Sequence, residues 1–188
     1  LIANANPISR DLRLMGSNIK LLPYGSYILN SQMSTFTMND GRLLGSLFVV
    51  TDTLTITGYG YYIYTAGDYT ADAYNGITLY KLNGDNLDVV VNSQTADDGN
   101  MWKVVGNNQK ALPSPIVIFP GLYYPRPLYN SSAQTTAPLM GSFGNSCNVF
   151  PSTSIKGSIR ASAVSTPASQ YQLSGQTNDV IINGIWIY

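Results

Sequence analysis

The stretch that decides the fold runs from residue 53 to residue 65 and reads Thr-Leu-Thr-Ile-Thr-Gly-Tyr-Gly-Tyr-Tyr-Ile-Tyr-Thr. In its first half Leu54 and Ile56 alternate with threonines, which is the period of two that a half-buried β-strand shows. Gly58 and Gly60 then interrupt the alternation and indicate a bulge or a close backbone approach that re-aims the tyrosines around them. The segment therefore predicts one long strand.

A β-hairpin is predicted downstream, at residues 77–91. Its two arms, 77–82 and 87–91, are rich in β-branched and other strand-forming residues, and they flank Asn83-Gly84-Asp85-Asn86. Asn-Gly supplies the positive φ values that a tight hairpin turn requires. This is the clearest local signal in the chain.

Further strand signals extend the pattern to both sides. Strands are expected at residues 43–50, 101–105, 116–119, 122–129 and 180–188. Proline cannot donate to a ladder, so edges or strand starts are expected at Pro113, Pro115, Pro120, Pro125 and Pro127. Residues 131–177 are expected to form long surface loops with two or three short strands. About seven or eight short strands joined by turns favour an all-β fold, a β-sandwich or jelly roll.

The first 40 residues differ from the rest because their apolar residues follow neither the helix period nor the strand period. We expect residues 1–40 to form an extended N-terminal arm or connector that precedes a β-sandwich domain at 41–188. Such an arm commonly packs on a neighbouring chain, since it cannot bury enough apolar surface alone. The chain starts at Leu1 without a leader pattern, and we expect further sequence upstream.

The composition excludes several classes of function. Lys+Arg and Asp+Glu are both 10, charged residues make up only 11 % of the chain, and neither Glu nor His occurs. Without His the chain has no Ser-His-Asp or Cys-His nucleophile and no imidazole-ligated zinc. The lack of a basic surface argues against nucleic acid, and no apolar run is long enough to cross a membrane. Cys147 is the only cysteine, and we interpret it as a structural thiol.

The aspartates leave two kinds of site to consider. Asp97-Asp98-Gly99-Asn100 offers clustered oxygen ligands for calcium, but Asp-Gly is also ordinary turn chemistry, which we favour. Asp85 and Asp88 are a weaker version of the same idea. A pair of carboxylates would suit glycoside hydrolysis, but no pair is singled out. We predict no metal, no cofactor and no catalytic residue.

The tyrosines are the most informative set. Tyr combines a flat apolar face with a polar tip, which suits cross-strand packing, a subunit interface or stacking on a sugar. We favour packing first and an interface second, and Trp102 and Trp186 are predicted to lie in the core or an interface. The candidates for glycan or interface contacts are Tyr59, Tyr61, Tyr123, Tyr124 and Tyr129.

Three blocks of sequence resemble a β-rich module of tailed-bacteriophage virion proteins (head-fibre, tail-fibre and minor structural proteins). The first block consists of Thr55-Ile56-Thr57-Gly58, Ala66-Gly67-Asp68-Tyr69-Thr70, Tyr74-Asn75-Gly76-Ile77 and Leu79-Tyr80. The second block is Asp97-Asp98-Gly99-Asn100-Met101-Trp102-Lys103. The third block consists of Gly121-Leu122-Tyr123-Tyr124 and Leu128-Tyr129-Asn130-Ser131-Ser132-Ala133-Gln134-Thr135-Thr136-Ala137-Pro138. They cover less than half of the chain. Where the family has an aromatic or small residue after Gly-Leu-Tyr-Tyr, this chain has Pro125-Arg126-Pro127, which predicts a broken or edge strand.

The resemblance implies a non-enzymatic component of the virion, usually multimeric. We expect it to lie on the particle surface and to assemble with itself, as a homo-trimer, and with other virion proteins. It implies no catalytic residue. One alternative is a carbohydrate- or receptor-binding module of a fibre tip or a bacterial adhesin, with host-surface glycan in an open groove at Tyr123, Tyr124 and Tyr129. A polysaccharide depolymerase with two close aspartates is a second alternative.

Overall fold

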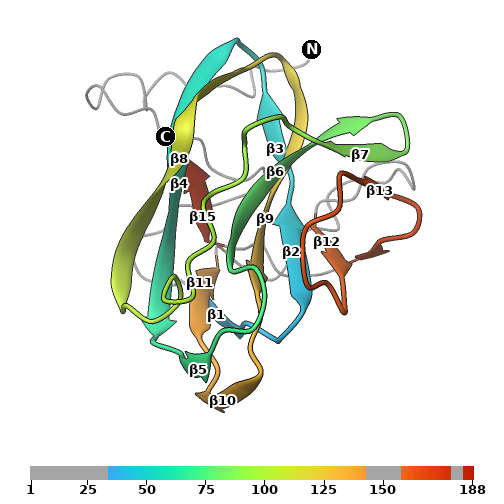
Figure 1. The fold of residues 1–188 in the computed structure, drawn as a ribbon. Helices are drawn as coiled ribbons and strands as arrows, with labels where there is room; N and C mark the ends of the chain where they lie inside the picture. The colour runs from blue at the N-terminus through green and yellow to red at the C-terminus, as the bar shows by residue number, and fades with distance from the viewer. Residues whose placement is uncertain (1–33, 143–157, 179–183) are drawn as a thin grey trace.

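The computed structural model describes residues 34–142, 158–178 and 184–188, and within those ranges it contains strands, turns and loops but no helix. Its strands form two curled antiparallel sheets that pack face to face, with a small two-stranded sheet at one end (Figure 1). The predicted all-β sandwich is confirmed. The end sheet consists of β5 (Asp68–Thr70) and β10 (Ala133–Thr136).

The first sheet is built around the long strand predicted from residues 53–65. This strand, β4 (Leu54–Thr65), pairs with β8 (Gly106–Ile118) along one side. Along its other side it pairs with β11 (Leu139–Ser142) and β15 (Ile185–Ile187). The register of β4 against β8 shifts between Ile56 and Gly58, which confirms the predicted bulge.

The sandwich begins before residue 41. Strand β1 (Ser34–Thr37) pairs with β11, and the side chains of Phe36 and Met38 are buried in the core. Residues 34–40 therefore belong to the domain. The rest of the predicted arm, residues 1–33, lies outside the described residues.

The second sheet contains the predicted hairpin, whose strands β6 (Gly76–Asn83) and β7 (Asn86–Val89) are joined by a tight turn with Gly84 at a φ of 62°. The sheet runs in the order β13 (Gln170–Gln172), β7 (Asn86–Val89), β6 (Gly76–Asn83), β9 (Gly121–Tyr129), β2 (Arg42–Ser46), β12 (Ser158–Ala161) and β14 (Thr177–Asn178), with β3 (Phe48–Val50) also on β9. The predicted strand at 43–50 is thus split in two.

Residues 158–178 bridge the two sides of the second sheet. Strand β12 pairs with β2 on one side, and β13 pairs with β7 on the other. The segment lies to the right in Figure 1, in orange and red. It closes a second core, separate from the core between the sheets, whose buried members are Leu47, Tyr80, Leu87, Tyr124, Ile159 and Leu173.

Two strand predictions need correction. Residues 101–105 form turns and bends instead of a strand, and the Trp102 side chain is fully buried in the core between the sheets. Pro125 and Pro127 do not mark an edge, since β9 pairs with β6 along one side and with β2 and β3 on the other. On the side of β9 that pairs with β2 and β3, residues 124–127 lie between the two paired stretches and have no strand partner. Proline, which has no N–H to donate, is therefore tolerated at positions 125 and 127.

The remaining strand predictions fit with small changes. Pro113 and Pro115 lie in β8, which pairs only with β4 among the described residues and is an edge there. The strand expected at 116–119 is the end of β8, and that at 122–129 is β9. Of the strand expected at 180–188, β15 is described, and residues 179–183 lie outside the described ranges.

Candidate functional site

The five tyrosines predicted as glycan or interface contacts are all inside the chain, and none is more than 4 % exposed. Tyr59 and Tyr61 from β4 and Tyr123 and Tyr129 from β9 share the core between the sheets, whereas Tyr124 lies in the second core. Successive residues of a strand point to opposite faces, and both faces of β9 are covered. The open groove expected at Tyr123, Tyr124 and Tyr129 is therefore not found in the described structure.

The hydroxyl groups of these tyrosines tie loops to the core. Tyr59 donates to the carbonyl oxygen of Ser93 at 2.7 Å, and Tyr61 donates to that of Met101 at 2.9 Å. Both acceptors lie in the connection from β7 to β8, which joins the two sheets. Each buried phenol is thus satisfied by a partner within the protein, as buried polar groups generally are.

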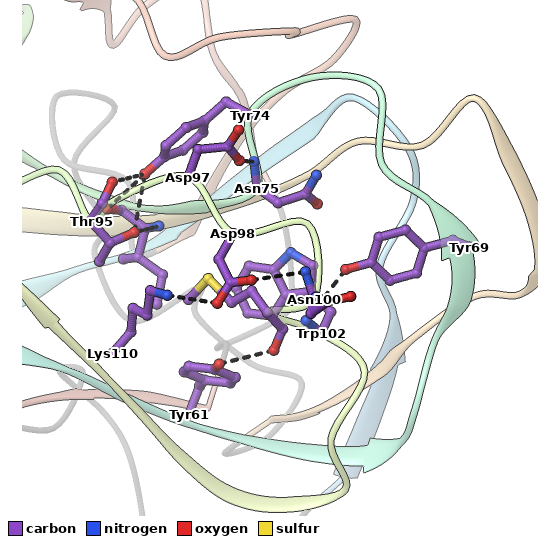
Figure 2. Close-up of polar contacts among 12 residues, drawn as sticks. Tyr61, Tyr69, Tyr74, Asn75, Thr95, Asp97, Asp98, Asn100, Trp102 and Lys110 are labelled. Atoms are coloured by element: carbon purple, nitrogen blue, oxygen red, sulfur yellow. Dashed lines mark hydrogen bonds and ion pairs between the residues drawn. The ribbon is translucent and has the colours of Figure 1, made fainter.

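The Asp97-Asp98-Gly99-Asn100 turn lies in this connection, and its carboxylates have protein partners (Figure 2). Asp97 Oδ1 accepts from the backbone N–H of Asn75 at 2.8 Å. Asp98 Oδ1 accepts from the N–H of Asn100 at 2.9 Å, and Lys110 Nζ lies 2.6 Å from Asp98 Oδ2. Lys110 lowers the pKa of Asp98. The contacts favour the turn interpretation over calcium, and the described residues hold no cluster of three acidic or cysteine ligands.

Other aspartates also hold segments together. Asp40 Oδ1 accepts from the N–H of Ser131 at 2.8 Å, and Asp85 Oδ1 accepts from the N–H of Ser174 at 2.9 Å. Each contact joins residues about ninety positions apart in the sequence. These carboxylates therefore connect segments that are distant in the sequence through hydrogen bonds to backbone N–H groups.

The core tyrosines stay protonated at neutral pH. Burial raises the pKa of Tyr59, Tyr61 and Tyr80 well above its usual value, and it raises the pKa of Tyr69 to about 12. A phenol in an apolar core loses the hydration that its anion needs. These phenols are thus uncharged at neutral pH and can act as hydrogen-bond donors.

Arg126 is the unexpected feature of the molecule, because it is fully buried in the second core. Its Nη2 donates to the carbonyl oxygen of Leu43 at 3.0 Å and to Gln176 Oε1 at 2.8 Å, while Nε and Nη1 have no partner among the described residues. The guanidinium carbon lies 4.9 Å from the ring centre of Tyr171 and 5.5 Å from that of Tyr80. Burial lowers the pKa of Arg126 to about 10, so it remains a cation at neutral pH.

The local sequence explains how this cation fits. Arg126 stands between two prolines that end the pairing of β9 with β2 and β3, which leaves a gap beside the strand. Gly45 of β2 provides the space for the Arg126 stem, since a Cβ added at Gly45 would lie 2.9 Å from Arg126 Cγ. Cation–π contacts contribute about 2 kcal/mol when desolvated, whereas each unsatisfied buried donor costs about 1–3 kcal/mol. The protein thus tolerates an incompletely satisfied charge at this position.

The described residues line at least two concave regions of the surface. The first is a cleft of about 360 Å³ between the β6–β7 hairpin and the end of β8, with Tyr123 at its border. Its polar groups include Lys81, Asn83 and Asp88, and its apolar wall includes Phe119, which is 58 % exposed. Sequence reasoning missed this site because it relied on the tyrosines, and Phe119 is a single aromatic residue at the end of the strand predicted at 116–119.

The second concave region, of about 520 Å³, lies on the 158–178 segment. Arg160, Tyr171 and Gln176 line it together with small hydroxyl-bearing residues. Tyr171 and Gln176 are also among the residues that contact Arg126, which itself does not line this pocket. Nothing in the sequence alone pairs Arg126 with residues fifty positions away.

Further features bear on identity. Among the described residues, no helix is long and apolar enough to cross a membrane. Cys147 lies outside the described ranges. A scan against protein-family models gives no match, and a search of curated proteins gives none either.

Proposed function

We propose that the protein is a non-enzymatic structural component of a bacteriophage virion, a fibre or a capsid- or tail-decorating subunit, that assembles as a homo-trimer at the particle surface. The observation that carries the proposal is the surface of β4 and β8, on which every exposed side chain is uncharged. We call it the neutral surface, and its members are Thr55, Thr57, Tyr64, Asn107, Gln109, Ala111, Pro113, Ser114, Pro115 and Val117.

The neutral surface has the properties of a subunit interface. About a quarter to a third of an ordinary soluble surface carries charge, and interface centres are depleted of it. Strand β8 also pairs only with β4 among the described residues, so its outer edge offers backbone N–H and C=O groups to a neighbour. If copies of the chain packed through this surface, both the uncharged side chains and the open edge of β8 would be buried. The sequence resemblance to phage virion proteins supports the same assignment.

A matched pair of charge insertions tests the assembly. We expect Ala111→Glu to convert the oligomer to a monomer of 20.4 kDa, because it places a carboxylate in the neutral surface. Ala133→Glu, at an alanine on β10 that is also exposed, should leave the oligomer intact. The measurement is light scattering after size-exclusion chromatography. Identical masses for the two variants would contradict the role of this surface.

The virion location has its own test. Antibodies raised against the chain should label purified particles of a phage that encodes it, at positions repeated with the symmetry of the particle. Unlabelled particles, with strong labelling of the free protein in the same lysate, would contradict the location.

A second candidate function, a carbohydrate-binding module, is favoured by the first cleft. Exposed Phe119 offers a ring that can stack on a sugar, and Lys81, Asn83 and Asp88 offer hydrogen bonds to its hydroxyls. We expect Phe119→Ala to reduce binding to host-surface polysaccharide by about tenfold, since an aromatic contact contributes about 0.5–1.5 kcal/mol beyond the area that it buries. Val105→Ala, at a side chain that is also 58 % exposed but lies outside the cleft, is the control. Equal polysaccharide binding by the two variants would show that this cleft is not the carbohydrate-binding site.

A further inference from the structure

We propose that Asn83, at the tip of the β6–β7 hairpin, is a site of spontaneous deamidation, at which water converts the asparagine to a mixture of aspartate and isoaspartate. The inference is independent of the functions proposed above, because it rests only on the chemistry of Asn-Gly pairs and on their surroundings. Two such pairs lie wholly within the described residues, Asn75-Gly76 and Asn83-Gly84, and their environments are opposite.

The reaction has two steps and needs no reagent other than water. The backbone nitrogen of the residue after the asparagine attacks the side-chain Cγ and forms a C–N bond, and the amide group leaves as ammonia, taking the proton of the attacking nitrogen. Water then opens the resulting cyclic imide at either of its carbonyl carbons, which yields aspartate or isoaspartate. Glycine favours the first step, because it has no Cβ to hinder the approach and its backbone rotates freely.

The Asn83-Gly84 pair meets these requirements. Both residues are exposed. The side-chain amide of Asn83 has a single partner among the described residues, Asp88 Oδ2, at a distance of 3.4 Å that makes a weak hydrogen bond. Gly84 has a φ of 62°, and apart from its chain neighbours no atom lies within 4 Å of the position that a Cβ would take. Neither packing nor hydrogen bonding therefore keeps the nitrogen of Gly84 from Cγ of Asn83.

The Asn75-Gly76 pair is held in place instead. Asn75 is fully buried, and its Nδ2 donates to the carbonyl oxygens of Ala73 and Asn130, both at 3.0 Å. Its Oδ1 accepts from the backbone N–H of Asn130 at 3.0 Å. Gly76 is buried too, and a Cβ added there would lie 2.6 Å from Thr95 Oγ1. This pair can react only after its part of the core opens, so the fold protects it.

Deamidation at Asn83 changes both the charge and the backbone of the hairpin. Either product places a carboxylate beside Asp88 in the first cleft, where the amide had donated a hydrogen bond. Isoaspartate also adds one methylene group to the main chain next to a two-residue turn, and the length of such a turn sets the register of its strands. Leu82 and Leu87 are paired directly behind the turn, and Leu87 is buried in the second core. We therefore expect isoaspartate to loosen the pairing of β6 with β7.

The experiment ages the intact wild-type chain in mildly alkaline buffer and follows both asparagines by peptide mapping. Trypsin cleaves after Arg42, Lys81 and Lys103, so Asn75 and Asn83 fall in separate peptides, 43–81 and 82–103. We expect Asn83, located by its fragment ions, to gain one mass unit and to give isoaspartate, which enzymatic methylation detects, about a hundredfold faster than Asn75. In urea the two residues should react at similar rates, because the protection of Asn75 depends on the fold.

Matched variants locate the reaction within peptide 82–103. Asn83→Gln should abolish the modification, since a glutamine would have to form a six-membered ring, whereas Asn86→Gln, at the other end of the turn, should leave it unchanged. In the modified chain, separated from the fresh chain by its charge, hydrogen exchange should be faster at the backbone amides of residues 81–88. The proposal is overturned if Asn83 keeps its amide in the folded chain but loses it in urea, if the folded chain modifies Asn75 as fast as Asn83, or if Asn83→Gln is modified like the wild type.

Discussion

Unfolding at alkaline pH is expected to be steep and cooperative, beginning above about pH 10. Tyrosines of the unfolded chain ionise there, whereas the raised pKa values of Tyr59, Tyr61 and Tyr80 keep these phenols protonated in the folded chain. The unfolded state then binds fewer protons, so stability falls as pH rises. Each such tyrosine costs about 1.4 kcal/mol per pH unit, and three cost about 4 kcal/mol. A total stability of about 5–15 kcal/mol is therefore exhausted within a few pH units.

Arg126 acts in the opposite direction. Its pKa is lowered to about 10 in the folded chain, so above that pH the unfolded chain holds more protons at this residue than the folded chain does. Stability contributed by this residue rises with pH until the unfolded arginine also loses its proton. One arginine offsets about one tyrosine, and the net slope remains unfavourable.

Tyr59→Phe provides the control for the alkaline prediction. At neutral pH the variant should be less stable by about 1–2 kcal/mol, because the hydrogen bond to Ser93 is lost. Above about pH 10 it avoids the ionisation cost, so its stability should equal and then exceed that of the wild type between about pH 11 and 12. Circular dichroism and tyrosinate absorbance measure both transitions. Titration of all the tyrosines near their usual pKa, with the fold intact, would contradict the account.

Trp102→Ala is expected to reduce the free energy of unfolding by about 3–5 kcal/mol. Trp102 is fully buried, its ring centre lies 5.0 Å from that of Tyr61 on the first sheet, and its Nε1 donates to the Leu128 carbonyl oxygen on the second sheet at 3.2 Å. The substitution leaves a large cavity between the sheets and an unpaired carbonyl. Both effects weaken the contact that joins the β7–β8 connection to the core.

Urea unfolding at a fixed protein concentration measures this effect, because association would otherwise shift the midpoint. Val104→Ala, two residues away on a side chain that is 58 % exposed, should change stability by less than about 0.5 kcal/mol. Trp102→Phe should give an intermediate loss, since it keeps a ring and removes the N–H donor. If Trp102→Ala lowers the free energy of unfolding by less than about 1 kcal/mol, the packing of Trp102 between the sheets does not stabilise the fold as proposed.

Local patterns in the sequence predict much of the fold, for identifiable reasons. The alternation at residues 53–65 and the Asn-Gly turn after residue 82 depend on contacts between near neighbours, and both predictions are confirmed. Residues 101–105 carry apolar side chains that resemble a strand, but Trp102 uses its bulk to fill space between sheets. That role depends on residues far away in the sequence.

The candidate sites are harder to predict because their residues meet only in the folded chain. Packing is the favoured interpretation of the tyrosines from sequence, but the sequence does not show which of them are buried. Tyr59 and Tyr61 lie on the inner face of β4, and both faces of β9 are covered, so Tyr123, Tyr124 and Tyr129 are buried as well. Arg126 looks like a surface charge between two prolines, and its position depends on the gap between β2 and β3 and on the missing side chain of Gly45. Neither condition is visible from the Pro-Arg-Pro sequence itself.

Assembly through the neutral surface is the central claim, and the solution mass of the unmodified chain tests it most directly. Light scattering after size-exclusion chromatography should give three times 20.4 kDa, independent of concentration over the accessible range. A mass of 20.4 kDa at every concentration would contradict the claim, because the uncharged surface and the open edge of β8 would then be exposed to solvent in the free protein.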